Sequence, residues 1–169
     1  MRLKKGIRNL MIVLIIACNI GCDQISKTIV REEVDYNENI TLITRFLTLT
    51  KIENSGAFLS VGDSLPFVVR FVVLSLIPLI ALGAGLYIVL TRISMKRPIV
   101  IGICFVIGGG IGNLYDRMLY GSVTDFLHMD FVLFKTGIFN MADVSIMIGI
   151  LTIMIFTYIA KNKRVQYQR

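Results

Sequence analysis

The sequence has little charge and few of the side chains that bind metals or form disulfides. Only 17% of its 169 residues are charged, whereas an average soluble domain carries about 25%. It has no tryptophan and a single histidine, His128, so a metal site built from clustered histidine and cysteine is not expected. Its three cysteines, Cys18, Cys22 and Cys104, lie in apolar runs, where we interpret them as small core residues. This composition argues against an ordinary water-soluble domain.

What the sequence has in excess is long apolar stretches without charge. Four such runs extend over residues 9–22, 71–91, 98–115 and 144–160. A helix that crosses the hydrocarbon core needs about 20 mostly apolar residues. The second and third runs have about that length, and the other two reach it only by including Asp23 and Asp143. We therefore predict an all-α polytopic membrane protein with a single membrane-embedded domain over residues 1–169. Its four transmembrane helices are expected at about 8–28, 65–91, 98–116 and 137–160.

The basic residues gather on one side of the predicted membrane. Eleven of the 18 Lys and Arg residues precede the first run, separate the second from the third, or follow the fourth, with no acidic residue among them. Short basic loops stay in the cytoplasm. Both termini are therefore expected to be cytoplasmic, with residues 23–70 and 116–143 on the outer side. The net charge of +7 thus comes mainly from basic residues whose positions orient the chain in a membrane. It does not indicate nucleic acid binding.

The segment between the first two predicted helices has a different pattern. Residues 34–62 are rich in alternating apolar and β-branched residues, and turn formers such as Asn37 and Asn39 interrupt them. This pattern predicts a small extracytoplasmic antiparallel β-sheet on the outer membrane surface. The pattern of residues 117–136 favours neither helix nor strand.

Two predicted helices carry a carboxylate near their outer ends. Asp23 lies four residues before Lys27 and so on the same helical face. If the fourth helix begins near residue 137, Asp143 lies about 9 Å inside it, with Asn140 on the same face. An ionised carboxylate in hydrocarbon costs roughly 2.5–3.5 kcal/mol and usually faces a cavity or a bundle interior. These residues indicate a site, although Asp143 as a simple helix cap remains the alternative.

The third predicted helix ends in a glycine-rich segment at a similar depth. Asn113, Asp116 and Arg117 lie on one face there, and the glycines allow close helix approach. The structural alternative is that Asp116 with Arg117, like Asp23 with Lys27, only forms an ion pair that fixes a helix end.

A pair of aspartates is the most economical chemistry that these residues allow. Two close carboxylates cannot both ionise, so one keeps a proton and acts as an acid while the other activates water. Asp143 and Asp125, from the preceding connection, are the natural pair. Two alternatives stay open: a Ser55 nucleophile with Lys27 or Lys51 as base, and a small proton-coupled transporter or ion pathway that uses a buried aspartate.

The first apolar run also has the form of a cleavable lipoprotein signal. Lys4 and Lys5 precede the apolar stretch, and Ala17 precedes Cys18. A lipid-anchored protein would not need three further spans, so we interpret this run as a retained first helix. A lipoprotein or membrane scaffold with no chemistry stays a third option.

Five segments resemble the signature blocks of the bacterial lipoprotein signal peptidase family, also called signal peptidase II. They are Asp23-Gln-Ile-Ser-Lys27, Asn54-Ser-Gly-Ala-Phe58, Gly109-Gly-Ile-Gly-Asn-Leu-Tyr-Asp-Arg117, Val123-Thr-Asp-Phe126 and Phe139-Asn-Met-Ala-Asp143. They occur in the family's order on a four-helix topology, which makes the resemblance specific. One departure is that a single alanine, Ala57, follows the glycine of the second block, where the family often has two.

The resemblance implies an aspartic endopeptidase of the bacterial cytoplasmic (inner) membrane that needs no metal or other cofactor. It would cleave diacylglyceryl-modified prolipoproteins immediately before the lipidated cysteine, near the extracytoplasmic face, and its partners would include membrane lipids and the cyclic peptide inhibitor globomycin. By family motif, Asp125 and Asp143 would form the catalytic dyad. The residues expected to support or line the site are Asp23, Lys27, Asn54, Gly56, Asn113, Arg117 and Asn140. Gly56 with Phe58 would let the outer sheet close over a bound peptide.

Overall fold

The computed structural model describes residues 2–36, 38–44, 46–56, 65–131 and 133–166. Ala57 and Phe58, whose segment was expected to close over a bound peptide, lie outside the described residues. So does the end of the predicted outer β segment.

Within this part of the chain, four helical rods are long and apolar enough to cross a membrane, as the apolar runs predict. The first is α1 (Arg2–Glu33), and the third and fourth are α4 (Arg97–Tyr120) and α5 (Met141–Gln166). The second combines α2 (Phe67–Phe71), a π-helical turn η2 (Val72–Leu76) and α3 (Ile77–Thr91). The π turn comes just before Pro78, which has no N–H for a regular helical bond.

The observed start of α5 corrects the predicted one. The helix begins at Met141 rather than near residue 137, so Asp143 lies in its first turn and not six residues inside it. Asn140 precedes the first helical residue, and its Oδ1 accepts a hydrogen bond from the Asp143 backbone N–H at 3.0 Å. In return, Asp143 Oδ2 accepts from the Asn140 N–H at 3.2 Å. This reciprocal cap fixes the start of α5.

Helix α4 lies at the centre of the bundle and packs against α1, α3 and α5. Glycines on α4 let its neighbours approach to backbone distance. A Cβ atom at Gly109 would overlap the carbonyl oxygen of Ala142 on α5, and one at Gly112 would overlap the carboxylate of Asp23 on α1. The glycines therefore bring α1 and α5 close to the outer end of α4.

We expect Gly112→Ala to lower the melting temperature in detergent by about 3–10 °C, since an added methyl group has no room beside the Asp23 carboxylate. Gly21→Ala on α1 is the matched control, because a Cβ atom there meets nothing within 4 Å. That variant should melt at or slightly above the wild-type temperature, because alanine favours helix over glycine. Equal melting temperatures for the two variants would contradict this packing.

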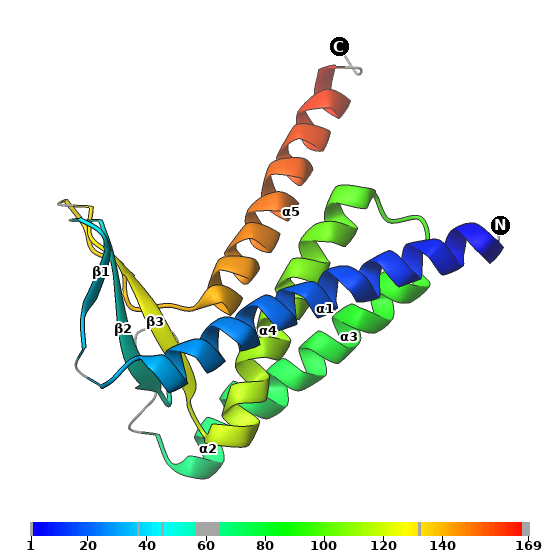
Figure 1. Cartoon of the computed structure of the whole chain (residues 1–169). Coiled ribbons are helices and arrows are strands. Elements are labelled where there is room, and N and C mark those ends of the chain that lie inside the picture. The colour runs from blue at the N-terminus through cyan, green and yellow to red at the C-terminus, as the bar shows by residue number, and fades with distance from the viewer. Residues whose placement is uncertain (1, 37, 45, 57–64, 132, 167–169) are drawn as a thin grey trace.

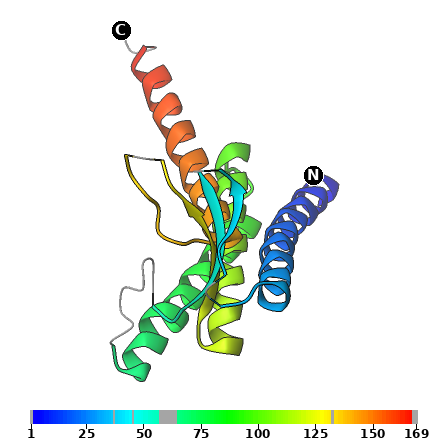
Figure 2. The ribbon, with the colours of Figure 1, turned by 60° about the vertical axis from the view of Figure 1, so that its left-hand side comes forward.

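A three-stranded antiparallel sheet lies at one end of the bundle, beside the end of α1 and the start of α5 (Figures 1 and 2). Its order is β1 (Ile40–Ile43), β2 (Leu47–Asn54) and β3 (Val123–Met129). The strands between the first two helices confirm the predicted sheet. The third strand comes from residues 117–136, for which the sequence favoured no structure. Val30 of α1 and Val34, just after the helix, pack against Phe126, which anchors β3 to α1.

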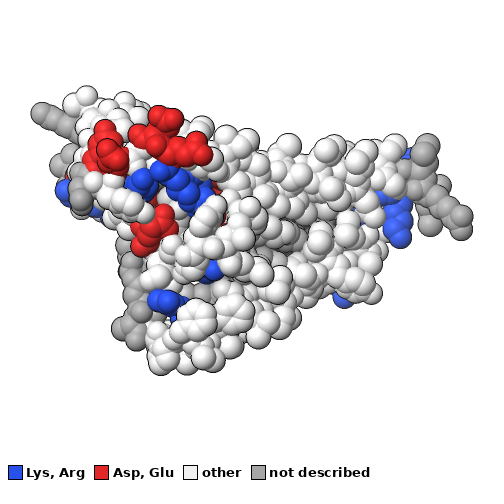
Figure 3. All heavy atoms as spheres, turned by 60° about the horizontal axis from the view of Figure 1, so that its bottom comes forward, with Lys and Arg blue, Asp and Glu red and all other residues white. Residues whose placement is uncertain are grey.

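Charge is segregated along the molecule. On the face drawn in Figure 3, acidic side chains gather only at the end that carries the sheet, while Lys and Arg reappear at the opposite end. Both termini lie at that opposite end (Figure 1). The apolar surface between the two ends has the length and composition of a membrane-spanning region.

Candidate active site

Asp125 lies near the start of β3 with its side chain buried. Only 4% of the residue is exposed, although a carboxylate normally needs water. Two amides replace that water. Asn54, the last residue of β2, donates from Nδ2 to Asp125 Oδ2 at 2.9 Å, and Asn140 donates from Nδ2 to Asp125 Oδ1 at 2.6 Å. The carboxyl group is therefore held from two sides by neutral donors.

Asp143 lies across from this group, in the first turn of α5. Besides the cap to Asn140, its Oδ1 accepts a hydrogen bond from Asn113 Nδ2 on α4 at 2.9 Å. Its position at a helix N-terminus favours a negative charge, because the backbone N–H groups and the helix dipole point towards it. Asp143 thus does cap its helix, and it also lines the site.

The two carboxylic side chains line the same small cavity. Its volume is about 30 Å³, and its lining residues are Asn54, Asn113, Arg117, Val123, Asp125, Asn140 and Asp143. A cavity of this size has room for one or two water molecules. Asn140 joins the two halves, since it bonds to Asp125 through its side chain and to Asp143 through its cap.

Burial raises the pKa of Asp125 from its ordinary value of 3.8 to about 6. Loss of hydration is the largest cause, and the hydrogen bond from Asn54 acts in the opposite direction. The nearby charge of Asp143 raises the pKa further, while the hydrogen bond from Asn140 lowers it. Asp125 therefore keeps its proton to a higher pH than an exposed aspartate does, as a general acid near neutral pH requires.

Lys27 does not line the cavity itself but contacts Asn113, which does. Its side chain is fully buried. Its Nζ lies 2.8 Å from Asp23 Oδ2 and 2.9 Å from Asp116 Oδ2, and both carboxylates are fully buried. Its third donor bonds to Asn113 Oδ1 at 2.9 Å. The ammonium thus faces two carboxylates and one amide oxygen. The contact with Asn113 fixes the amide so that its Nδ2 group faces Asp143.

Asp23 connects the same network to α5. Its Oδ1 accepts a hydrogen bond from the backbone N–H of Ala142 at 2.8 Å, one of the N–H groups that a helix start leaves unpaired. The expected pair of Asp23 with Lys27 is therefore present, and it holds α1 against both α4 and the start of α5.

Arg117 has a different partner from the one expected. The structure contains no ion pair between it and Asp116 among the described residues, and its Nη2 instead donates to the carbonyl oxygen of Gly56 at 3.0 Å. Asp116 pairs with Lys27 and with Arg31 Nη2, the latter at 2.9 Å. Arg117 thus lines the cavity and ties it to the segment that follows β2.

Sequence reasoning missed Arg31 and Gln24 as members of this network. Arg31 continues the spacing of Asp23 and Lys27 by another four residues, a signal that places all three on one helical face. Gln24 Nε2 lies 3.1 Å from both Asp23 Oδ2 and Asp116 Oδ1. No spacing rule on α1 alone indicates that contact with α4.

The lysines proposed as a base for Ser55 have other partners. Lys51 Nζ donates to the Arg31 carbonyl oxygen at 3.2 Å and lies 4.5 Å from the centroid of the Tyr36 ring. Lys27 is held between two carboxylates. The geometry therefore supports the aspartate pair over a serine–lysine pair.

The comparisons with known proteins agree on one family. The sequence model of signal peptidase (SPase) II matches residues 15–159. The lipoprotein signal peptidase of Listeria monocytogenes is 30% identical over 144 residues, which cover 85% of this chain and 90% of that protein. The enzyme of the same name from Streptococcus agalactiae is 30% identical over 148 residues, with 88% and 92% covered.

Two solved structures share the fold of this chain. One bacterial membrane enzyme solved at 2.3 Å matches with a TM-score of 0.80 and 26% identity over 90% of each chain. A second, solved at 1.9 Å, matches with a TM-score of 0.75 and 27% identity over 87% of this chain and 92% of the other. With the membrane-spanning helices and the match over most of its length, the chain belongs to the signal peptidase II family of multi-pass membrane enzymes, which remove signal peptides from prolipoproteins.

Proposed function

We propose that the enzyme is an aspartic endopeptidase whose dyad is Asp125 and Asp143. The observation that carries this proposal is that both carboxylic side chains line one water-sized cavity. Asn140 holds the two of them together. Two carboxyl groups in such a position share a proton, which gives the site an acid and a base at once.

The environments of the two carboxyl groups suggest their roles. Asp125, with a pKa of about 6, carries the proton, and Asp143, at the N-terminus of α5, is the carboxylate. Asp143 removes a proton from water as the water oxygen attacks the scissile carbonyl carbon, and Asp125 donates its proton to the carbonyl oxygen. The tetrahedral intermediate collapses when Asp143 gives the proton it took from water to the amide nitrogen and Asp125 takes back the hydroxyl proton. The C–N bond then breaks, which leaves a new acid and a new amine and restores the starting protonation of the dyad.

The other polar groups position the reacting ones. Asn54, Asn113 and Asn140 are neutral donors that orient the carboxylates without adding charge. Arg117 lines the cavity and can stabilise negative charge on the substrate carbonyl oxygen. Asp23 and Lys27 act at a distance by holding α1, α4 and α5 together, and the Gly56 carbonyl anchors Arg117.

The charge distribution supports a cytoplasmic location for both termini and an extracytoplasmic location for the site. Basic residues lie at the end of the bundle that holds the termini, and the cavity lies at the sheet end. In the bacterial inner membrane, this arrangement presents the dyad to a membrane-anchored precursor at the outer surface. The substrate is a diacylglyceryl-modified prolipoprotein, cleaved immediately before the lipidated cysteine. The enzyme also contacts the surrounding membrane lipids and binds the inhibitor globomycin.

Incubation of the purified enzyme in detergent with a lipidated precursor peptide tests this function. Mass spectrometry should find one cut, immediately before the modified cysteine. The control peptide has the same sequence without the diacylglyceryl group, and its kcat/KM should be at least about 100-fold lower, because it lacks the apolar contacts of two buried acyl chains. Equal cleavage of both peptides would refute the lipid requirement, and no cleavage of either would refute the proposed reaction.

A further inference from the structure

A polar cluster joins the last turn of α1 to the outer sheet. Arg31 of α1 donates from Nε to the Thr124 hydroxyl oxygen on β3 at 2.8 Å. That hydroxyl donates in turn to Glu53 Oε1 on β2 at 2.8 Å, and Glu53 Oε2 accepts from the Ser122 hydroxyl at 2.6 Å. Arg31 Nη2 also lies 2.9 Å from Asp116 Oδ1 on α4. All five residues belong to the described part of the chain, and none of them lines the dyad cavity.

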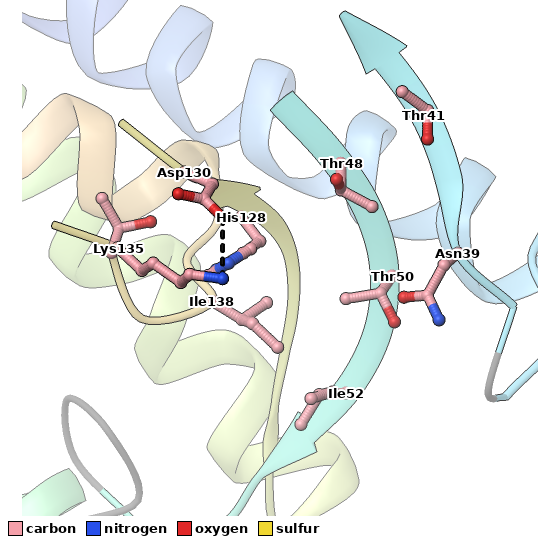
Figure 4. A pocket seen from close by; sticks show the side chains of 10 residues that line it. Asn39, Thr41, Thr48, Thr50, Ile52, His128, Asp130, Lys135 and Ile138 are labelled. Atoms are coloured by element: carbon pink, nitrogen blue, oxygen red, sulfur yellow. Dashed lines mark ion pairs between the residues drawn. The ribbon is translucent and has the colours of Figure 1, made fainter. Parts of the chain in front are cut away.

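Thr124 is more deeply buried than the threonines of β1 and β2. Thr124 and the Asp116 carboxylate are fully buried, and the Arg31 side chain is 19% exposed. By contrast, Thr41 of β1 and Thr48 of β2 line a hollow on the sheet (Figure 4). A hydrogen bond between buried groups holds their relative position, because neither group can replace its partner by water without a penalty.

The contact with Arg31 acts on β3 directly beside the dyad. Thr124 precedes Asp125, and adjacent residues of a strand point to opposite faces. Thr124 therefore faces α1, while Asp125 faces the cavity. The next residue, Phe126, packs against Val30 of α1. Arg31 thus adds a directional bond to an apolar contact and restricts how far Asp125 moves relative to α1.

Asp116 connects the same guanidinium to the other half of the dyad. Its Oδ2 lies 2.9 Å from Lys27 Nζ, and Lys27 Nζ donates to Asn113 Oδ1 at 2.9 Å. The Asn113 amide donates in turn to Asp143 Oδ1 at 2.9 Å. A displacement of Asp116 therefore reaches, through two contacts, the amide that holds Asp143. Arg31 contacts the supports of both carboxyl groups.

We propose that Arg31 and Thr124 are positioning residues of the reaction, which set the distance between Asp125 on β3 and Asp143 on α5. The inference rests on the proposed function, because it takes these two carboxyl groups to be the catalytic ones. A misplacement of about 1 Å at a reacting group can lower a rate roughly a hundredfold. Arg31 and Thr124 do not line the cavity, so their loss lowers kcat and leaves KM unchanged.

The shape of the guanidinium is what this role requires. Nε bonds to Thr124, Nη2 lies beside Asp116, and the Arg31 Cζ atom lies 4.2 Å from the centroid of the Tyr120 ring. A lysine carries the same charge on a single nitrogen at the end of a flexible stem. It can compensate the charge of Asp116 without also holding Thr124. Arg31→Lys therefore separates positioning from charge compensation.

Substitutions of Thr124 provide the main test. Valine keeps the shape of the side chain without the hydroxyl group, and serine keeps the hydroxyl group. With the lipidated precursor peptide, well below the melting temperature of each variant, kcat of Thr124→Val should fall at least about tenfold while KM stays within about twofold of the wild-type value. Thr124→Ser should keep kcat within about twofold of the wild type.

Arg31→Lys tests the same contact from its other side. It should lower kcat by about as much as Thr124→Val does. The double variant should lose no more than either single one, because both substitutions remove one shared hydrogen bond. If Thr124→Val does not fold, kcat of Arg31→Lys alone decides: a wild-type value overturns the proposal and a loss of about tenfold or more supports it.

The matched control is Thr41→Val, the same substitution at an exposed residue of the edge strand β1 (Figure 4). It should keep kcat within about twofold of the wild type. An unchanged kcat in Thr124→Val, even with a lower melting temperature, would overturn the proposal, and so would an equal loss in Thr124→Ser. The wild-type enzyme cleaves the peptide in each of these outcomes. They are therefore distinct from failure of the proposed function, in which the wild type does not cleave it.

Discussion

Asp125→Asn and Asp143→Asn should each reduce kcat for the lipidated precursor by about a thousandfold or more, because an amide can neither donate nor accept the proton that the reaction transfers. The substitutions keep the size of the side chain. Both variants are therefore expected to fold and to insert in the membrane. Turnover of the lipidated peptide, measured by mass spectrometry, gives the rate.

A third carboxylate serves as the control for this pair. Asp35 is exposed in the connection after α1 and lies outside the cavity. Asp35→Asn should keep wild-type turnover within about twofold, as surface substitutions away from a site usually do. If either dyad variant behaved like Asp35→Asn, that residue would have no part in proton transfer.

Lys27→Met should cause the largest loss of stability among single substitutions in the buried network. It removes the cation between two fully buried carboxylates, so that Asp116 keeps only Arg31 and Asp23 loses its ion pair. Breaking a buried ion pair in this way costs about 3–5 kcal/mol, because a charge remains without a partner. We expect a melting temperature lower by about 6–20 °C in detergent.

Two further variants separate this effect from general damage. Lys135→Met removes an ion pair whose lysine side chain is 66% exposed, and it should cost at most about 1 kcal/mol. Lys27→Met combined with Asp23→Asn removes one of the two buried negative charges and should recover part of the lost melting temperature. A melting temperature of Lys27→Met equal to that of Lys135→Met would contradict a buried charge network.

The membrane helices were predictable because the length of an apolar run is a physical requirement for crossing a bilayer. The start of α5 was predicted four residues too early, although Asn140 and Asp143 have the spacing of a reciprocal cap. Apolar residues on both sides of that cap obscured it. Local rules thus located the spans better than their ends.

Strand β3 and its partners could not be predicted from local pattern. A buried carboxylate interrupts the apolar alternation in β3, and the hydrogen bonds from Asn54 and Asn140 that make its burial possible come from distant parts of the chain. The contact of Arg117 with Gly56 likewise joins residues 61 positions apart. The sequence indicated which polar residues gather near the outer face, but not which of them bond to one another.

The most direct test of the dyad is an infrared titration of the Asp125 carboxyl group in the purified enzyme. The difference spectrum between wild type and Asp125→Asn should show a protonated carboxyl band that disappears as the pH rises through about 6, since burial raises the folded-state pKa. In the Asp143→Asn background, the same band should disappear at lower pH, because the negative charge that raises the pKa is gone. A midpoint near the ordinary value of 3.8 that is unaffected by Asp143→Asn would contradict a shared-proton pair.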